Sequence, residues 1–205
     1  MREILESAGT LVGAIIVAVI TQVTPPLVKY IKSKINKGKK GEEFKRNLTI
    51  REKINEALVE LRILSNANRV YILEYHNGDV SLSGLPFNYS SMTYENTDVS
   101  TKNMITEFQK VPISPVANFL VSLDNTLEGY SSIQENNTNS LLSQHMNYYG
   151  VATTYTFKIS NHIKDGVIGL DWVNEEGVTL TENQIKDIKT VVLRIKNLLS
   201  TITKY

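Results

Sequence analysis

The stretch from Ser7 to Val28 carries no charged residue, and it constrains the chain more than any other feature. Its centre, residues 11–20, is uninterrupted apolar sequence, and a helix needs roughly 20 mostly apolar residues to cross the ~30 Å hydrocarbon layer. Pro25 and Pro26 then kink or end a helix. The pattern predicts a single transmembrane helix, an N-terminal anchor over residues 1–28.

Two other interpretations of this stretch remain open. A cleaved signal peptide has a basic start and a small-residue cleavage site, but Arg2 is followed by Glu3 and Glu6, and no A-x-A pattern follows Ile20. A buried core helix would also be apolar, but it would seldom stand at a terminus beside a basic run. Inside the stretch, Gly9 and Gly13 have the G-x-x-x-G spacing that lets membrane helices pack closely, so we expect a homo-oligomer.

A basic run follows the apolar stretch and predicts a juxtamembrane linker over residues 29–47, with a hinge at residues 38–41. Lysine and arginine accumulate on the cytoplasmic side of a membrane span, so the domain is expected in the cytoplasm. Each basic residue near an anionic surface contributes about 1 kcal/mol of attraction, which predicts membrane lipid as a partner. Few aromatic residues interleave, so no nucleic acid is expected. The expected headgroup contacts are Lys29, Lys32, Lys34, Lys37, Lys39 and Lys40.

The remaining residues, 48–205, are enough for one domain with a real core. The chain has no cysteine, so disulfides and cysteine-based zinc sites are excluded. The three histidines lack any partner at metal-ligand spacing, and no phosphate-binding glycine loop or G-x-S-x-G motif occurs. The sequence therefore predicts a protein that is not an enzyme and needs no cofactor and no metal.

Apolar periodicity and turn residues predict the elements of this domain. Thr49 with Glu52, and Thr181 with Gln184, form capping boxes that predict the starts of two helices. Asp171 stands in the middle of a strand, and we expect it on the solvent face of the sheet. The expected helices are 48–66, 116–123, 141–149 and one from 181 onward, and the expected strands are 69–75, 87–95, 129–134, 152–160 and 167–173.

The run Gly166–Trp172, followed by Leu180–Ile185 and a long helix with an apolar stripe, resembles the end of a GAF domain. The strand Arg69–Tyr75 after an amphipathic helix resembles its beginning, so the similarity spans residues 48–203. The resemblance implies an α+β fold, an antiparallel GAF/PAS-like sheet flanked by N- and C-terminal helices. It also implies a ligand between the sheet and the irregular middle segment. Aromatic residues on strands are equally explained as core residues. The candidate ligand-binding residues are Tyr75, His76, Tyr94, Glu95 and Tyr155.

The layout is also similar to the holin family of T-even bacteriophages: an N-terminal span, a mixed α/β domain and a terminal helix after a strand that carries Trp172. Those holins place the domain outside the cytoplasm, opposite to the side that the basic run predicts.

Two functions are therefore expected from the sequence. The first is a membrane-anchored, non-catalytic binding or sensor module with a small-molecule or protein partner. The alternative is a phage holin-like lysis protein whose transmembrane helices oligomerise.

Overall fold

The computed structural model describes residue 29 and residues 40–76, 88–134, 141–160, 165–175 and 177–202. Two compact units are distinguished, Met1–Leu48 with Lys204–Tyr205, and Thr49–Thr203. The predicted anchor and its Gly9 and Gly13 lie outside the described residues. Among the described residues, no helix has the length and apolar character needed to cross a membrane.

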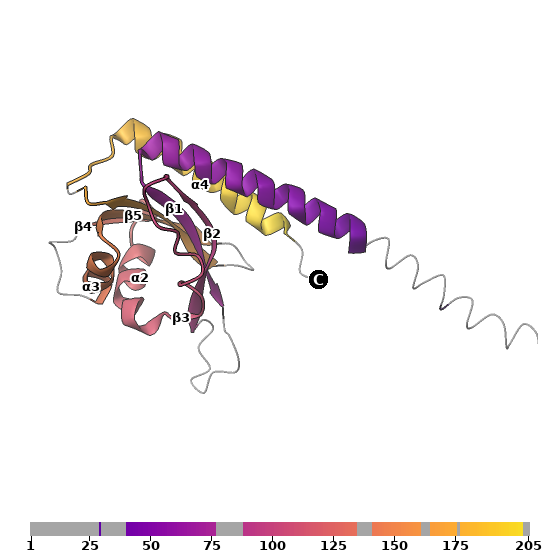
Figure 1. Cartoon of the computed structure of the whole chain (residues 1–205), viewed down its shortest axis with the longest axis horizontal. Helices are drawn as coiled ribbons and strands as arrows, with labels where there is room; N and C mark the ends of the chain where they lie inside the picture. The colour runs from indigo at the N-terminus through magenta and orange to yellow at the C-terminus, as the bar shows by residue number, and fades with distance from the viewer. Residues whose placement is uncertain are drawn as a thin grey trace, which may run out of the picture. The chain divides into compact units, whose positions relative to one another are not determined.

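The second unit is built on one six-stranded sheet in which every neighbouring pair is antiparallel. The strand order is β3-β2-β1-β6-β5-β4, so the first and last long strands of the domain, β1 and β6, pair at its centre (Figure 1). The strands are β1 (Arg69–His76), β2 (Tyr89–Thr97), β3 (Val111–Pro112), β4 (Tyr130–Gln134), β5 (Val151–Ser160) and β6 (Asp165–Val173).

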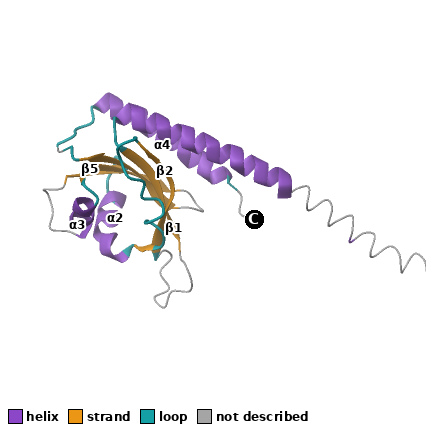
Figure 2. Ribbon diagram, viewed as in Figure 1, coloured by secondary structure: helices purple, strands orange, loops and turns teal. Residues whose placement is uncertain are grey.

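Helices lie on both sides of this sheet (Figure 2). Residues 49–65 of the first helix and α4 (Glu182–Thr201) run along one side. On the other side lie α2 (Ala117–Asp124) and α3 (Leu141–Tyr148), preceded by the 3₁₀ turn η1 (Ser114–Val116). The predicted α+β arrangement, an antiparallel sheet with an N-terminal and a C-terminal helix, is confirmed.

The side of the sheet under the two long helices is a dry hydrophobic core. Strand residues alternate between faces, so every second side chain of a strand enters this layer. The helices contribute apolar stripes at helical spacing that pack against them. The core includes Ile54, Leu58 and Leu61 of the first helix, Val70, Ile72, Ile168, Leu170 and Trp172 of the central strands, and Ile188, Val192, Ile195 and Leu199 of α4.

The predicted start of α4 is confirmed in detail. The Thr181 hydroxyl accepts a hydrogen bond from the Gln184 amide, and the Gln184 side chain accepts one from the Thr181 amide. Leu180 and Ile185 join the same core cluster on either side of this cap. Local side-chain chemistry therefore fixes where the last helix begins.

Other boundaries differ from the sequence expectation. The first helix already includes residue 40, so Thr49 lies inside it and does not act as its N-cap. Residues 42–46 contain good helix formers, which lets the helix run through the cap signal and through Gly41 of the expected hinge. Asp165 and Gly166, which precede the expected strand 167–173, belong to β6 because they pair with Ser160 and Ile159.

Candidate functional site

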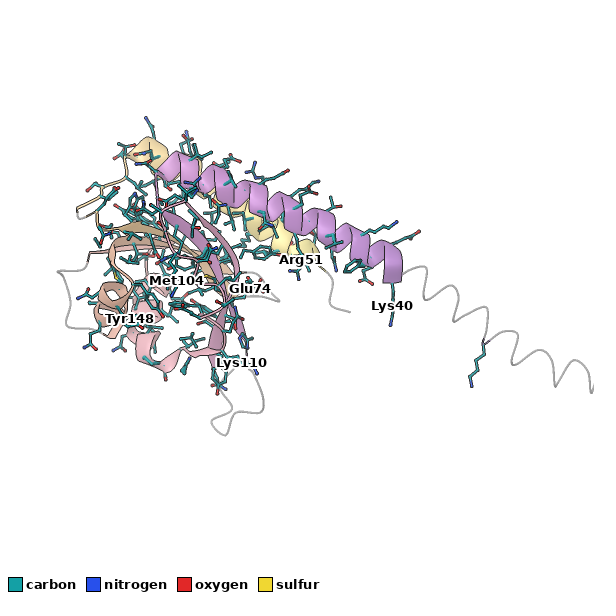
Figure 3. All side chains as sticks on the ribbon, viewed as in Figure 1. Lys40, Arg51, Glu74, Met104, Lys110 and Tyr148 are labelled. Carbon is teal, nitrogen blue, oxygen red and sulfur yellow. The ribbon has the colours of Figure 1, made fainter. Side chains whose placement is uncertain are left out.

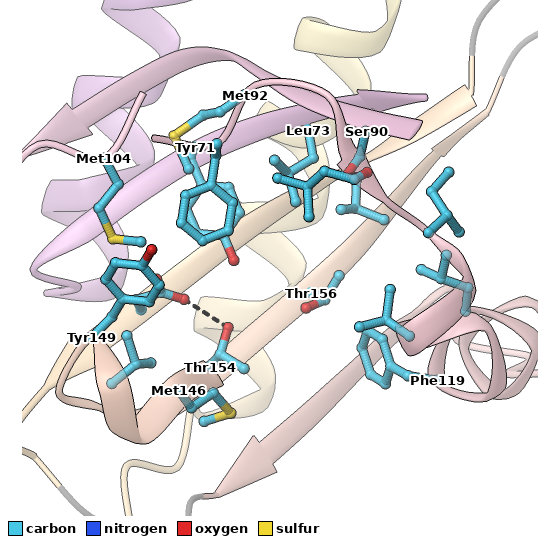
Figure 4. Close-up of a pocket in the computed structure, with 18 of the residues that line it drawn as sticks. Tyr71, Leu73, Ser90, Met92, Met104, Phe119, Met146, Tyr149, Thr154 and Thr156 are labelled. Carbon is cyan, nitrogen blue, oxygen red and sulfur yellow. Dashed lines mark hydrogen bonds between the residues drawn. The ribbon is translucent and has the colours of Figure 1, made fainter. Parts of the chain in front are cut away.

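A cavity of about 300 Å³ lies between the sheet and the segments that cover its second face. The sheet supplies its floor, with Tyr71 and Leu73 of β1, Met92 of β2 and Thr154 and Thr156 of β5 (Figure 4). The roof comes from the loop after β2, from η1 and α2, and from the end of α3: Met104, Phe108, Ile113, Val116, Phe119, Leu120, Met146 and Tyr149. Met104 is seen on this side of the sheet in Figure 3.

One end of the cavity holds a buried charge cluster. Arg69 opens β1, and its side chain is only 3 % exposed. Its Nη1 donates to Asp171 Oδ2 at 3.1 Å, and its Nη2 donates to the Lys102 carbonyl at 3.0 Å. Its Nε lies 3.2 Å from Glu95 Oε1, an ion-pair contact without good hydrogen-bond geometry. One guanidinium therefore serves two carboxylates.

Asp171 is buried, and this corrects the expectation that it faces solvent. Its Oδ1 accepts a hydrogen bond from the Thr154 hydroxyl at 2.8 Å, drawn as a dashed line in Figure 4. Burial raises the pKa of Asp171 above its ordinary value, while Arg69 opposes that rise. Removal of a carboxylate from water disfavours its charged form, and one shared guanidinium offsets the effect only in part.

Tyr71 lies across the sheet floor because β6 offers a glycine directly opposite it. Tyr71 pairs with Gly169, and a Cβ at Gly169 would stand 2.2 Å from Tyr71 Cζ. The phenol hydrogen bonds with Thr154 and Asp171. Burial, followed by the negative charge of Asp171, raises the pKa of Tyr71 well above its ordinary range, so the phenol stays protonated.

Glu95 fixes the roof over this end. Its carboxylate accepts hydrogen bonds from the amides of Met104 and Ile105 at 2.8–2.9 Å. The same carboxylate faces Arg69, so the loop after β2 is tied to the charge cluster. Gln109 also connects this loop to β2, because its side-chain amide donates a hydrogen bond to the Met92 carbonyl at 2.8 Å.

The structure places two of the five predicted ligand residues at the cavity and two in the core on the helix side of the sheet. Tyr75 lines the cavity, and burial raises its pKa. Glu95 reaches the cavity through Arg69. Tyr94 and Tyr155 belong to the helix-side core, where the Tyr155 hydroxyl accepts from the Leu180 amide at 3.3 Å. His76, at the end of β1, lies 2.8 Å from the Ser91 hydroxyl and stacks on Tyr89.

Sequence reasoning missed most of the cavity. It did not connect Arg69 with Asp171, and it assigned no role to Thr154 or Thr156. A signal existed: a carboxylate in the centre of an apolar strand, and threonines alternating with aromatic residues along β5. The roof residues gave no such sequence signal, because they are apolar residues in a segment without regular periodicity.

Four of the six predicted lipid-contacting lysines lie outside the described residues. Lys29 and Lys40 are exposed, and Lys40 is labelled in Figure 3. Lys32, Lys34, Lys37 and Lys39 are outside the described residues. Within the described ranges, no group of three or more histidine, aspartate or glutamate side chains is placed to hold a metal ion.

Comparison with known proteins identifies the fold. No protein-family model matches the sequence, and no curated protein matches it. Solved structures do match. A phycocyanobilin-bound GAF domain from a cyanobacterial phytochrome is 12 % identical with a TM-score of 0.58, and the match covers 78 % of this chain and 94 % of that one. A far-red cyanobacteriochrome photoreceptor is 10 % identical with a TM-score of 0.57, covering 83 % and 99 %.

A third match is the GAF domain of a two-component sensor histidine kinase from Bacillus halodurans, 12 % identical with a TM-score of 0.55, covering 74 % of this chain and 94 % of that one. At these identities the similarity establishes the fold alone, so the chain has a GAF-like fold. The resemblance to phage holins finds no support in these comparisons.

Proposed function

We propose that this chain is a non-catalytic, membrane-anchored sensor module whose GAF-like domain binds a small molecule in the cavity between the sheet and its roof. The cavity is the observation that carries the proposal. Ligand pockets are concave and mostly apolar, with a few placed polar groups, and they begin at about 300 Å³. The cavity has this volume and this composition, with apolar walls and polar residues gathered on the sheet floor.

A similar fold is known with a bound small molecule. One matching GAF domain is bound to phycocyanobilin, so the architecture is compatible with a bound small molecule. In the present chain the lining residues include no cysteine, so a ligand here is held without a bond to a thiol.

A binding role also fits the way the polar groups are engaged. Asp171 accepts hydrogen bonds from both Arg69 and Thr154, and Glu95 accepts hydrogen bonds from two backbone amides. Polar groups held in place in this way are suited to orienting a ligand.

The anchor supplies the second half of the proposal. Residues 7–28 have the length and the lack of charge of a membrane span, and the lysines after them favour a cytoplasmic domain. In this arrangement Gly9 and Gly13 mediate contacts between copies within the membrane. The domain then senses its ligand while it is held at the membrane surface.

The test compares two neighbouring residues of α2. Leu120 lines the cavity, whereas Val121 is exposed. The full chain, purified in detergent, is screened by thermal shift against a metabolite library. We expect at least one compound to stabilise the wild-type protein and Val121→Trp but not Leu120→Trp, because the indole fills the cavity. Equal stabilisation of both variants, or no stabilising compound, contradicts the proposal.

A further inference from the structure

The charge cluster at the end of the cavity is unbalanced. Arg69 is the only cationic residue among those described that line the cavity, and it faces the carboxylates of Asp171 and Glu95. Lys102 does not correct the imbalance, because its side chain is 73 % exposed and its ammonium pairs with Glu107. The nearby phenols of Tyr71 and Tyr149 are held neutral, since burial raises both pKa values. With Arg69, Asp171 and Glu95 ionised, the cluster therefore carries one excess negative charge at a buried site.

The two carboxylates differ in how fully hydrogen-bond donors and cations compensate their charges. Glu95 is satisfied by two backbone amides and by Arg69. Asp171 has hydroxyl donors and a share of one guanidinium, and burial still raises its pKa. Asp171 is also the carboxylate that lines the cavity. An added positive charge would be stabilised most at Asp171.

A second polar group marks the cavity as a binding site. Thr156 is 6 % exposed and lines the cavity. Figure 4 shows this side chain on the sheet floor, on the same strand as Thr154. Its hydroxyl can both donate and accept a hydrogen bond, so it suits a polar group of a ligand. Two positions along a strand separate Thr154, which bonds Asp171, from Thr156, or about 7 Å.

The walls between these groups suit an apolar body. Met92, Met104 and Met146 line the cavity together with Phe108 and Tyr149. Thioethers are polarisable and adapt to flat or irregular ligands. Aromatic faces also attract a cation.

We propose that the cavity recognises a small apolar cation, with an ammonium or amidinium head at Asp171 and a second polar group at Thr156. The proposal rests on the binding function proposed above, and it specifies the chemical class of the ligand. The head neutralises the excess charge, the second group hydrogen bonds with the Thr156 hydroxyl, and the hydrocarbon or aromatic body lies among the methionines.

Three of the four methionines line the cavity, so methyl NMR of the full chain labelled with ¹³C-methyl methionine reports binding there directly. Three probes share one body and differ in head charge: 2-phenylethylammonium, 2-phenylethanol and phenylacetate. Hydrogen bonds to charged groups contribute about 1.5–3 kcal/mol, so the cation should bind tenfold or more tightly than the alcohol. Phenylacetate should bind most weakly.

Two variants assign the preference to residues. Asp171→Asn keeps the shape and leaves Arg69 balanced by Glu95, so the cation should lose its advantage over the alcohol. Tyramine adds a hydroxyl to the ammonium probe, and it should bind the wild-type protein about threefold more tightly than 2-phenylethylammonium does. The Thr156→Val variant should bind the two compounds with equal affinity. The Trp172 fluorescence maximum verifies that each variant is folded.

The outcomes separate this proposal from the broader one. If the alcohol binds the wild-type protein as well as the cation does, the cationic class is refuted and the binding function stands. If no probe moves the methionine signals, the cationic class is also refuted, and the metabolite screen decides the binding function independently. If tyramine gains equally in Thr156→Val, the role of Thr156 is refuted.

Discussion

Gly169 provides a quantitative test of how the cavity floor is built. The Tyr71 ring lies across this residue, and an added Cβ would stand 2.2 Å from Cζ and 2.4 Å from the phenol oxygen. Gly169 is not among the described residues with positive φ, so alanine can adopt its backbone conformation. Any cost of Gly169→Ala therefore comes from the contact with Tyr71.

The size of that cost follows from the geometry. Ordinary contacts begin at 3.4 Å, so the ring must retreat by roughly 1.2 Å. Forced repacking of this kind costs about 1–3 kcal/mol, and loss of the phenol hydrogen bond to Asp171 adds about 1 kcal/mol. We expect Gly169→Ala to lower the free energy of unfolding by about 2–4 kcal/mol.

A double-mutant cycle isolates the contact. In a Tyr71→Ala background the obstruction is gone, and alanine in a strand restricts the unfolded chain more than glycine does. Gly169→Ala should then be neutral, or stabilising by up to about 1 kcal/mol. The coupling energy between the two positions should be about 2–4 kcal/mol, well above the additivity error for distant sites.

Urea unfolding of the full chain provides the measurement. Trp172 is the only tryptophan and lies in the core, so its fluorescence reports on this domain alone. Gly166→Ala is the control, because its Cβ would meet the Leu73 backbone oxygen at 2.2 Å, which truncation of Tyr71 cannot relieve. An equal cost of Gly169→Ala in both backgrounds would refute the packing described here.

Three further changes test other parts of the chain. Thr181→Ala removes the capping box of α4 and should cost about 1 kcal/mol in urea unfolding, and an unchanged midpoint would contradict its role. Asp171→Asn tests the effect of burial on the Asp171 carboxyl. Because burial raises its pKa, the folded protein keeps this carboxyl protonated at pH values where the unfolded chain releases the proton. The free energy of unfolding of the wild-type protein, relative to that of the variant, should therefore fall as pH rises above 3.8. Parallel stability curves would contradict the raised pKa. A reporter fused after Tyr205 should be active in the cytoplasm, and changing the six predicted lipid-contacting lysines to glutamine should weaken that orientation. External activity in the unmodified chain would overturn the cytoplasmic assignment.

Local patterns made much of the fold predictable. The alternation in β1 and β6, and the cap before α4, depend on residues close together in the chain. The charge cluster does not: Arg69 and Asp171 are separated by 102 positions, and only strand pairing brings them together. The roof was equally hidden, because it has no regular periodicity and is held by hydrogen bonds such as that from the Met104 amide to the Glu95 carboxylate.

The alternation of strand side chains also explains why the predicted ligand set divides. Tyr94 and Glu95 are neighbours on β2, so their side chains lie on opposite faces of the sheet. Tyr94 joins the helix-side core, whereas Glu95 meets Arg69 beside the cavity. Tyr155 follows the same rule between Thr154 and Thr156, which both line the cavity. A ligand on the cavity side can therefore contact Tyr75 and the threonines directly, whereas Tyr94 and Tyr155 influence it only through the sheet that separates them.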